Sequence, residues 1–216
     1  MISLTNEQIL ESIYRLSFIE QERVTKAVLM KAFHLTLYQI SPIIKRLVTS
    51  DLVNYHPHRE IKLTVQGDEL TNCIIQSQRL WLTFLVNDLK LPLDIAYPDS
   101  IRLSYNTSFA VMENLRKNLN YPLADPLGWS IGLKDSVEGL IHPKQLSVGQ
   151  KGEVVRLNYS NEAKTGYFAR NNIKVGTVIE GAIGEEANGE IGIITSKILY
   201  VLMSDKMSNA IYLKLV

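Results

Sequence analysis

The chain has little cysteine, no long apolar run and almost no excess of charge. One cysteine, Cys73, in 216 residues excludes an intramolecular disulfide framework and is typical of a reducing compartment. No stretch approaches 18 consecutive apolar residues, and the amino terminus lacks the basic and apolar regions of a secretory signal. With 46% hydrophobic residues and a net charge of +1, the sequence predicts a cytoplasmic protein of one large or two small domains, without a membrane partner.

Residue patterns typical of enzymes and metal centres are also missing. We find no nucleophile with a base, and the glycines between 181 and 192 lack the Lys-Ser/Thr pair of a phosphate loop. His56 and His58 could share one face of a strand as half of a zinc site. No third ligand is in view, so a loop that contacts phosphate groups is the favoured interpretation. The sequence therefore predicts a protein that is not an enzyme and has no cofactor or metal.

Residues 24–62 carry the clearest pattern in the chain. Two amphipathic runs, each with apolar residues at helical spacing, are preceded by possible caps at Thr25 and Thr36. Two alternating runs, 53–56 and 61–64, predict a hairpin with a polar loop. This order of helix, turn, helix and hairpin is that of a winged helix-turn-helix, whose second helix enters the DNA major groove.

The charge of this stretch agrees with a DNA-binding face. Residues 23–62 contain seven bases and two acids, a net charge of +5 on a nearly neutral chain. A solvated face of an ordinary helical domain is the alternative. Base reading is assigned to the front of the second helix and phosphate contact to the bases around it. The predicted DNA-binding residues are Thr25, Lys26, Tyr38, Gln39, Ser41, Pro42, Lys45, Arg46, His58 and Arg59.

Further elements are predicted on both sides of this stretch. Thr5-x-x-Gln8 is a capping box that opens a first helix over residues 5–19, and residues 68–91 form a long apolar helix. A second helical region follows Pro98. We expect these helices to form a homodimer anchored by Trp81, Phe84 and Leu85, although a purely intramolecular core is the other interpretation.

The carboxyl-terminal third differs in composition. Residues 120–143 contain three prolines and three glycines and are predicted to be a turn-rich linker. Five short β-prone runs between residues 149 and 215 predict a small β-barrel. The fold class is therefore α+β. The predicted domains are a winged helix-turn-helix at 1–66, a helical dimerisation domain at 67–120, a linker at 121–143 and a barrel at 144–216.

Several segments, in this order, resemble the diphtheria toxin repressor and manganese transport regulator family of bacterial metal-dependent repressors. The segments are Glu11-Ser12-Ile13-Tyr14-Arg15-Leu16, residues 47–53, Leu63-Thr64-x-x-Gly67, Gln78-Arg79-Leu80, Asp125-Pro126-x-Gly128 and residues 144–216, which are similar to a FeoA-like barrel. The resemblance covers essentially the whole chain. It implies DNA binding, a dimer and the three-part fold.

The positions at which this family binds metal are occupied by other residue types here. They hold Gln8, Gln78, Leu82, Tyr97, Asp99, Ile101, Ser104 and Tyr105. Divalent transition metals need several converging donors, and aliphatic side chains offer none. We therefore predict a sequence-specific transcription regulator that binds double-stranded DNA and is not switched by divalent metal, with an unknown effector possible. A protein-interaction scaffold is the alternative, and salt-dependent DNA binding separates the two.

Overall fold

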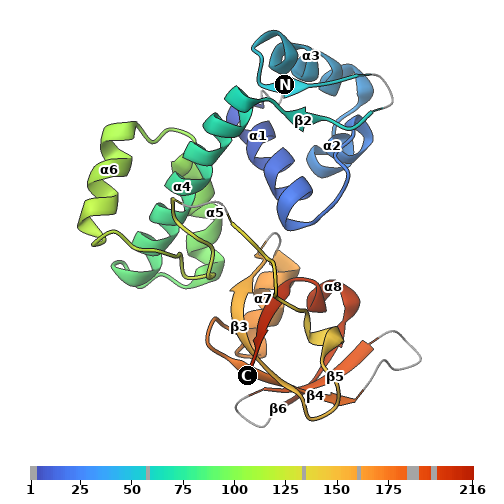
Figure 1. Ribbon diagram of the computed structural model, residues 1–216. Helices are drawn as coiled ribbons and strands as arrows, with labels where there is room; N and C mark the ends of the chain where they lie inside the picture. Colours follow the sequence, from blue (N-terminus) through green and yellow to red (C-terminus); the bar gives the residue numbers. More distant parts are fainter. Residues whose placement is uncertain (1–3, 57–58, 133–134, 160–161, 184–189, 196–198) are drawn as a thin grey trace. The chain divides into compact units, whose positions relative to one another are not determined.

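A computed structural model of the chain describes residues 4–56, 59–132, 135–159, 162–183, 190–195 and 199–216. The chain divides into two compact units. Unit 1 consists of residues 1–78 and 101–108, and unit 2 consists of residues 79–100 and 109–216. The boundary between Gln78 and Arg79 falls inside one long helix (Figure 1).

Unit 1 begins with three helices, each preceded by a threonine. They are α1 (Asn6–Tyr14), continued by the π-helical turn η1 (Arg15–Ile19), then α2 (Lys26–Phe33) and α3 (Leu37–Thr49). The Thr5 hydroxyl accepts the backbone N–H of Gln8 at 3.4 Å, and the Thr25 hydroxyl accepts that of Val28 at 3.3 Å. These bonds satisfy first-turn N–H donors that have no partner inside the helix. The predicted caps at Thr5 and Thr25 are therefore confirmed.

The break between α2 and α3 turns the chain sharply. His34 ends α2 in the left-handed conformation, with φ of 53°, and the N–H of Leu35 donates back to the carbonyl of Met30 at 2.9 Å. This local turn sets α2 and α3 at 116° to each other, within the range of helix-turn-helix units. In the described residues no single helix is long and apolar enough to cross a membrane, and only this bent pair, taken together, has the length and composition.

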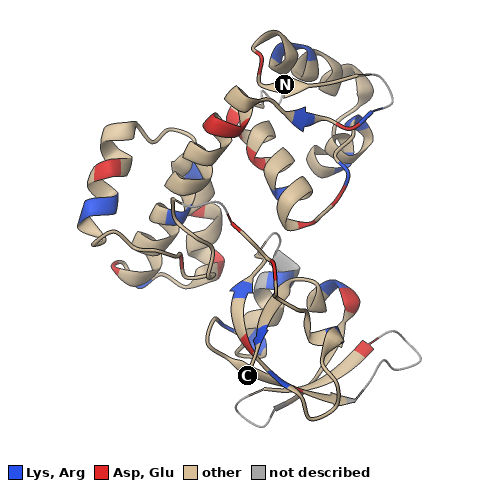
Figure 2. Ribbon diagram, in the orientation of Figure 1, with Lys and Arg blue, Asp and Glu red and all other residues tan. Residues whose placement is uncertain are grey.

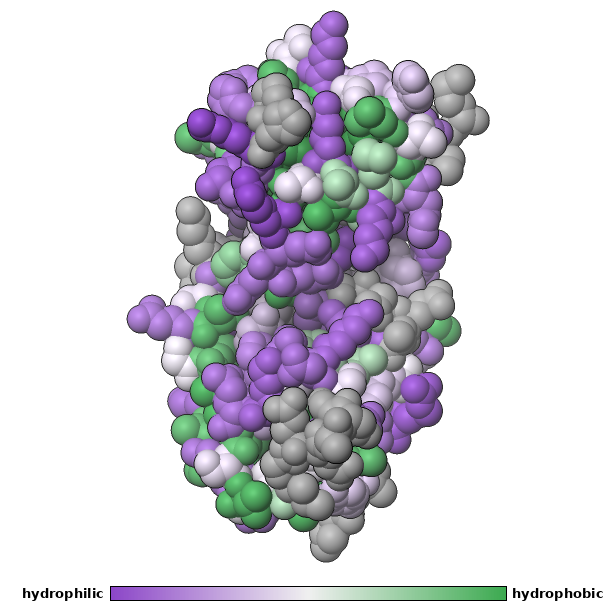
Figure 3. Space-filling model, turned by 90° about the vertical axis from the view of Figure 1, so that its right-hand side faces the viewer, coloured by the Kyte–Doolittle hydropathy of each residue, from purple (hydrophilic) through white to green (hydrophobic). Residues whose placement is uncertain are grey.

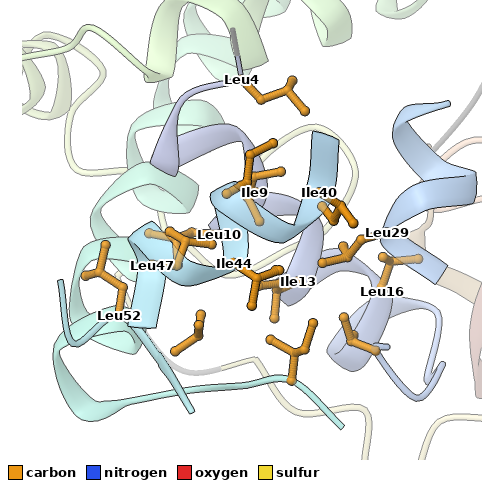
Figure 4. Packing of buried hydrophobic residues seen from close by; sticks show 14 of the residues in the cluster. Leu4, Ile9, Leu10, Ile13, Leu16, Leu29, Ile40, Ile44, Leu47 and Leu52 are labelled. Atoms are coloured by element: carbon orange, nitrogen blue, oxygen red, sulfur yellow. The ribbon is translucent and has the colours of Figure 1, made fainter. Parts of the chain in front are cut away.

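The core of unit 1 collects one face from each helix. Figure 4 shows Ile9, Leu10 and Ile13 of α1 directed toward Ile40 and Ile44 of α3. All five side chains are buried, with at most 1% exposed. Burial of a side chain of this size contributes roughly 1.5–3 kcal/mol, so this interior is the main source of the unit's stability. It also leaves the opposite face of α3 turned to solvent.

A two-stranded antiparallel hairpin follows α3. Its strands, β1 (Val53–Asn54) and β2 (Lys62–Leu63), pair Val53 with Leu63. They are shorter than the predicted runs, since the chain between them also bonds elsewhere. The N–H of Ile61 donates to the carbonyl of Val24 at 2.8 Å, which ties the hairpin to the segment before α2.

The long helix α4 (Val65–Asn87) begins three residues earlier than predicted. The Thr64 hydroxyl accepts the N–H of Gly67 at 3.0 Å, so Thr64 starts the helix. Gly67 does not interrupt it. A Cβ at Gly67 would lie 1.9 Å from the carbonyl oxygen of Leu52, so the missing side chain lets the helix approach the end of α3.

The predicted helical region after Pro98 is two helices. They are α5 (Leu93–Ser104), which contains Pro98, and α6 (Phe109–Asn118). In unit 2, the buried side chains of Leu80, Met112, Leu115 and Ile131 form a hydrophobic cluster with Trp81, Phe84 and Leu119 against it. Part of the apolar stripe predicted on the long helix therefore packs in this cluster within the chain.

All five predicted strands of the carboxyl-terminal part are present. They are β3 (Lys151–Leu157), β4 (Val178–Ile183), β5 (Glu190–Thr195), β6 (Leu199–Ser204) and β7 (Ile211–Leu215). They form an antiparallel sheet in the order β6-β5-β4-β3-β7. The short helices η2 (Pro143–Gln145), α7 (Glu162–Arg170) and α8 (Asp205–Ser208) were not predicted. Phe168 of α7 is completely buried, so α7 completes the core of the sheet.

The segment predicted to be a linker is folded in its first half. Oδ1 of Asp125 accepts the N–H groups of Leu127 and Trp129, both at 2.9 Å, and Trp129 Nε1 donates to the carbonyl of Leu157 on β3 at 2.8 Å. Gly128 is required here, because it has φ of +83° and its Cβ would lie 1.9 Å from the carbonyl oxygen of Val155. This segment therefore packs closely against β3.

Candidate nucleic-acid interface

The amino-terminal half of α3 presents an exposed front. Ile40 and Ile44 are buried, whereas Tyr38 is 92% exposed and Leu37 is 54% exposed. Pro42 is also exposed and Ser41 is half-buried. The helix therefore offers side chains to a partner, as a recognition helix must, and these side chains are largely apolar.

Gln39 is already engaged in the cap of α3. Its Oε1 accepts the backbone N–H of Thr36 at 2.8 Å and the Thr36 hydroxyl at 2.9 Å. Bidentate pairing with adenine needs both the oxygen and the nitrogen of the amide. The predicted adenine contact from Gln39 would thus require the loss of these two bonds.

Pro42 lies inside α3 without ending it. Proline has no N–H, so the carbonyl of Tyr38 cannot receive the helical bond that residue 42 would normally donate. Tyr38 and Pro42 are four residues apart and share one side of the helix. An unusual backbone position therefore coincides with the exposed front.

The two bases of α3 have different surroundings. Lys45 is exposed. Arg46 donates from Nε to Asn6 Oδ1 and from Nη2 to the carbonyl of Leu4, both at 2.8 Å. Arg46 therefore holds Leu4 and Asn6 against α3, and Lys45 is better placed to meet a phosphate. Sequence reasoning counted both as equal charges because these contacts span about forty positions.

Other predicted DNA-binding residues lie beside the hairpin. The Thr25 hydroxyl already accepts the N–H of Val28 as the cap of α2. Lys26 Nζ lies 4.6 Å from the centre of the Tyr55 ring. Arg59 is exposed in the hairpin loop. His58 lies outside the described residues. In Figure 2 lysine and arginine residues, drawn in blue, lie on α3 and on the hairpin. The positive charge predicted from the sequence is therefore carried by these elements of unit 1.

Of the predicted dimer anchors in unit 2, Leu85 is buried, whereas Trp81 and Phe84 are half-buried. Leu85 is 6% exposed, and the Trp81 and Phe84 rings meet edge to face with 6.0 Å between their centres. Both rings pack against the cluster around Leu80 and Met112. Large side chains do reach the surface elsewhere: Figure 3 shows hydrophobic residues between hydrophilic ones, and Phe109 at the start of α6 is 73% exposed.

The positions where the resembling family binds metal have structural roles here. Gln8 Oε1 accepts the N–H of Thr5 at 2.9 Å, and the Ser104 hydroxyl donates to the carbonyl of Ile101 at 2.8 Å. Leu82 is 1% exposed in the core. In the described residues no group of three or more His, Cys, Asp or Glu side chains could hold a metal ion. The donor set does not fit a divalent transition metal.

Glu11 is a buried carboxylate that the sequence did not single out. Burial raises its pKa above the ordinary value, and the Arg15 guanidinium opposes that rise. Arg15 Nε lies 3.7 Å from Glu11 Oε1, and Arg15 Nη1 lies 2.6 Å from Glu20 Oε1. Arg15 is thus shared between two carboxylates on the first helix and its π-helical end.

Neither a family model nor a curated protein matches the sequence. Solved structures do match. A "Manganese-dependent transcriptional repressor complex with manganese" has a TM-score of 0.87 and 21% identity, covering 98% of this chain and 100% of its own. The manganese regulator SloR has a TM-score of 0.82 and 22% identity, and both chains are covered completely.

The chain has the fold of the metal-dependent transcriptional repressors. A third structure, ScaR with bound Cd²⁺, agrees at a TM-score of 0.85 and 18% identity, covering 99% of this chain and 100% of ScaR. The resemblance inferred from scattered motifs is confirmed as a likeness of fold along the whole chain. Since the identities are low, the repressor fold alone does not transfer the metal sites of these proteins to this chain.

Proposed function

We propose that this protein is a DNA-binding transcription regulator, with unit 1 as a winged helix-turn-helix and α3 as its recognition helix. The exposed front of α3 is the observation that carries the proposal. It lies on a helix set at 116° to α2, beside a hairpin, and its other face is buried. The net charge of +5 over residues 23–62 suits a phosphate backbone.

The direct test is binding to duplex DNA at several salt concentrations. Binding should weaken steeply with salt, because each phosphate contact releases counterions. Replacing Lys45 by Ala should lower the slope of log K against log salt by about one unit for every sequence tested. Lys117 is an exposed base on α6, and Lys117→Ala is the matched control that should leave the slope unchanged. Absent or salt-independent binding would instead favour a protein-interaction scaffold.

The proposal includes a homodimer in the cytoplasm, where bacterial DNA is accessible. A dimer doubles the length of DNA that one short recognition helix can read. The helical part of unit 2 and the five-stranded sheet would then serve pairing and regulation, the sheet as a small FeoA-like barrel. Trp81 and Phe84 are half-buried and Leu85 is buried, so Phe109, which is 73% exposed, is added as a candidate for the contact between protomers.

The proposal also includes DNA binding without a divalent metal. The solved structures of this fold include repressors with manganese and Cd²⁺. In this chain the corresponding positions carry amide, hydroxyl and aliphatic side chains and a single carboxylate, that of Asp99. Leu82 is buried in the core, and Gln8 and Ser104 bond to the backbone. Side chains engaged in this way have no donor atom to offer an ion, and calorimetry with Mn²⁺ should show no stoichiometric binding.

A further inference from the structure

The five-stranded sheet of unit 2 ends in two edges that differ in their protection. At one edge β7 is covered, because Ile141 and Leu213 exchange two backbone hydrogen bonds of 3.0 Å and 2.7 Å. β7 also carries the exposed charge of Lys214, and such charges keep an edge strand from pairing with another chain. At the other edge, β6 has the sequence Leu-Tyr-Val-Leu-Met-Ser, without a charge or a proline. Its sequence therefore lacks the residues that usually protect an edge.

The side chains of β6 alternate between the inside and the outside of the sheet. Val201 and Met203 are buried, with 6% and 0% exposed. Tyr200 and Leu202 are 48% and 42% exposed. The Tyr200 ring lies over β5, where a Cβ at Gly192 would come within 2.4 Å of the Tyr200 hydroxyl. The edge strand therefore presents an apolar outer face, and an uncharged apolar edge is a template for another strand.

The Tyr167 hydroxyl reaches this edge from α7. It donates to the carbonyl of Leu202, in the middle of β6, at 2.9 Å. Burial, and then the Glu190 carboxylate, raises the pKa of Tyr167 to about 12, so the phenol keeps its proton and remains a donor. The next residue of α7, Phe168, is completely buried and anchors the helix. The hydroxyl therefore occupies a backbone acceptor that an additional strand would use.

We propose that β6 pairs with β6 of a second copy of this chain, antiparallel about a twofold axis at Leu202, and that the Tyr167 hydroxyl limits this pairing. A second copy is the occupant because an uncharged strand matches itself without repulsion, and a twofold axis makes every contact twice. The strand has six residues, a small contact beside the roughly 1,600 Å² of a stable interface, so the pairing is weak. It uses another surface than Phe109 and does not depend on DNA binding.

Sedimentation of the full-length protein over a range of concentrations measures this pairing. Tyr167→Phe keeps the ring and removes the hydroxyl. It should raise the association constant roughly tenfold or more, because two hydrogen bonds no longer have to break for each pair. Adding Leu202→Lys places like charges opposite each other at the twofold axis and should abolish the gain. Adding Val175→Lys instead is the matched control, since Val175 is 38% exposed in the turn before β4.

Cross-linking tests the register of the pair. In a Cys73→Ser background, Leu202→Cys should form a disulfide between two copies when an oxidant is added, because opposite residues of paired strands have Cα atoms about 5.5 Å apart. Val175→Cys should not, and circular dichroism checks that each variant is folded. An unchanged association constant in Tyr167→Phe would overturn the proposal, and so would equal cross-linking of the Leu202→Cys and Val175→Cys variants.

Discussion

Asp125 is a carboxylate with very little contact with water. It is 8% exposed, and burial raises its pKa from 3.8 to about 6 against the opposing effects of the Arg79 guanidinium and the N–H groups of Trp129 and Leu127. A raised pKa means that the folded protein binds the proton more tightly than the unfolded chain. The contribution of Asp125 to stability is therefore fully present below about pH 4 and is lost as the pH rises through about 6.

Asp125→Asn should remove this pH dependence. The amide oxygen can still accept both N–H groups, and no charge has to be buried. Between pH 4 and 7 the free energy of unfolding of the unmodified protein should fall by about 2 kcal/mol because of Asp125, and this fall should be absent in the variant. Urea unfolding at several pH values measures it. Asp88→Asn, at an exposed position, is the control, and an unchanged slope in Asp125→Asn would contradict the assignment.

At the scale of elements, the segment between α6 and β3 connects two parts of unit 2. Arg79 on α4 forms an ion pair with Asp135 at 2.6 Å and donates to the carbonyl of Ser130 at 2.7 Å. The Trp129 ring has the Arg79 and Arg156 guanidinium groups 5.7 Å and 5.2 Å from its centre. The segment therefore contacts both α4 and β3 and connects them.

Arg79→Ala should destabilise unit 2 by about 3 kcal/mol, because the Asp135 carboxylate, only 1% exposed, would stay buried without the guanidinium. Lys144→Ala provides the comparison, since Lys144 and Asp205 form an exposed ion pair at 3.0 Å whose loss should cost less than 1 kcal/mol. Chemical unfolding followed by tryptophan fluorescence reports both. Equally small decreases in the free energy of unfolding of the two variants would show that the buried ion pair contributes no more to stability than the exposed one.

Local signals account for what could be predicted among the elements. Thr5, Thr25 and the strands of the sheet depend on residues close in sequence, and the structure confirms them. Contacts over long separations could not be predicted in the same way. The bond from Trp129 to Leu157 gives order to a segment whose glycines and prolines suggested a linker. Helix α7 has a weak amphipathic pattern and is fixed by burial of Phe168.

The candidate site shows the same limit. Composition located the basic stretch and periodicity located the exposed side of α3, so Tyr38 and Lys45 were placed correctly on the surface. Whether a polar side chain is already engaged depends on three-dimensional contacts. The bonds of Arg46 to Asn6 and Leu4 are an example. Trp81 is half-buried against the cluster of unit 2, and its place in a dimer contact stays a prediction.

At the scale of the whole molecule, the proposed dimer should depend on Phe109. Phe109→Glu places a charge on a side chain that is 73% exposed, so the protomer should remain folded while sedimentation shows a shift from dimer to monomer. Val148→Glu is the matched control, because Val148 is 70% exposed and lies before β3. A dimer that survives Phe109→Glu with unchanged affinity would move the interface to another surface.

We propose that this protein, with its repressor fold, binds DNA without a divalent ion. A duplex that the protein has selected from a random-sequence pool is titrated with chelator-treated, full-length protein, alone and with Mn²⁺, Fe²⁺ or Zn²⁺ added in turn. We expect affinities that agree within a factor of two or so, because a ligand that does not distinguish two states cannot shift them. A gain of about tenfold or more with any ion, a coupling of about 1.4 kcal/mol, would contradict the account.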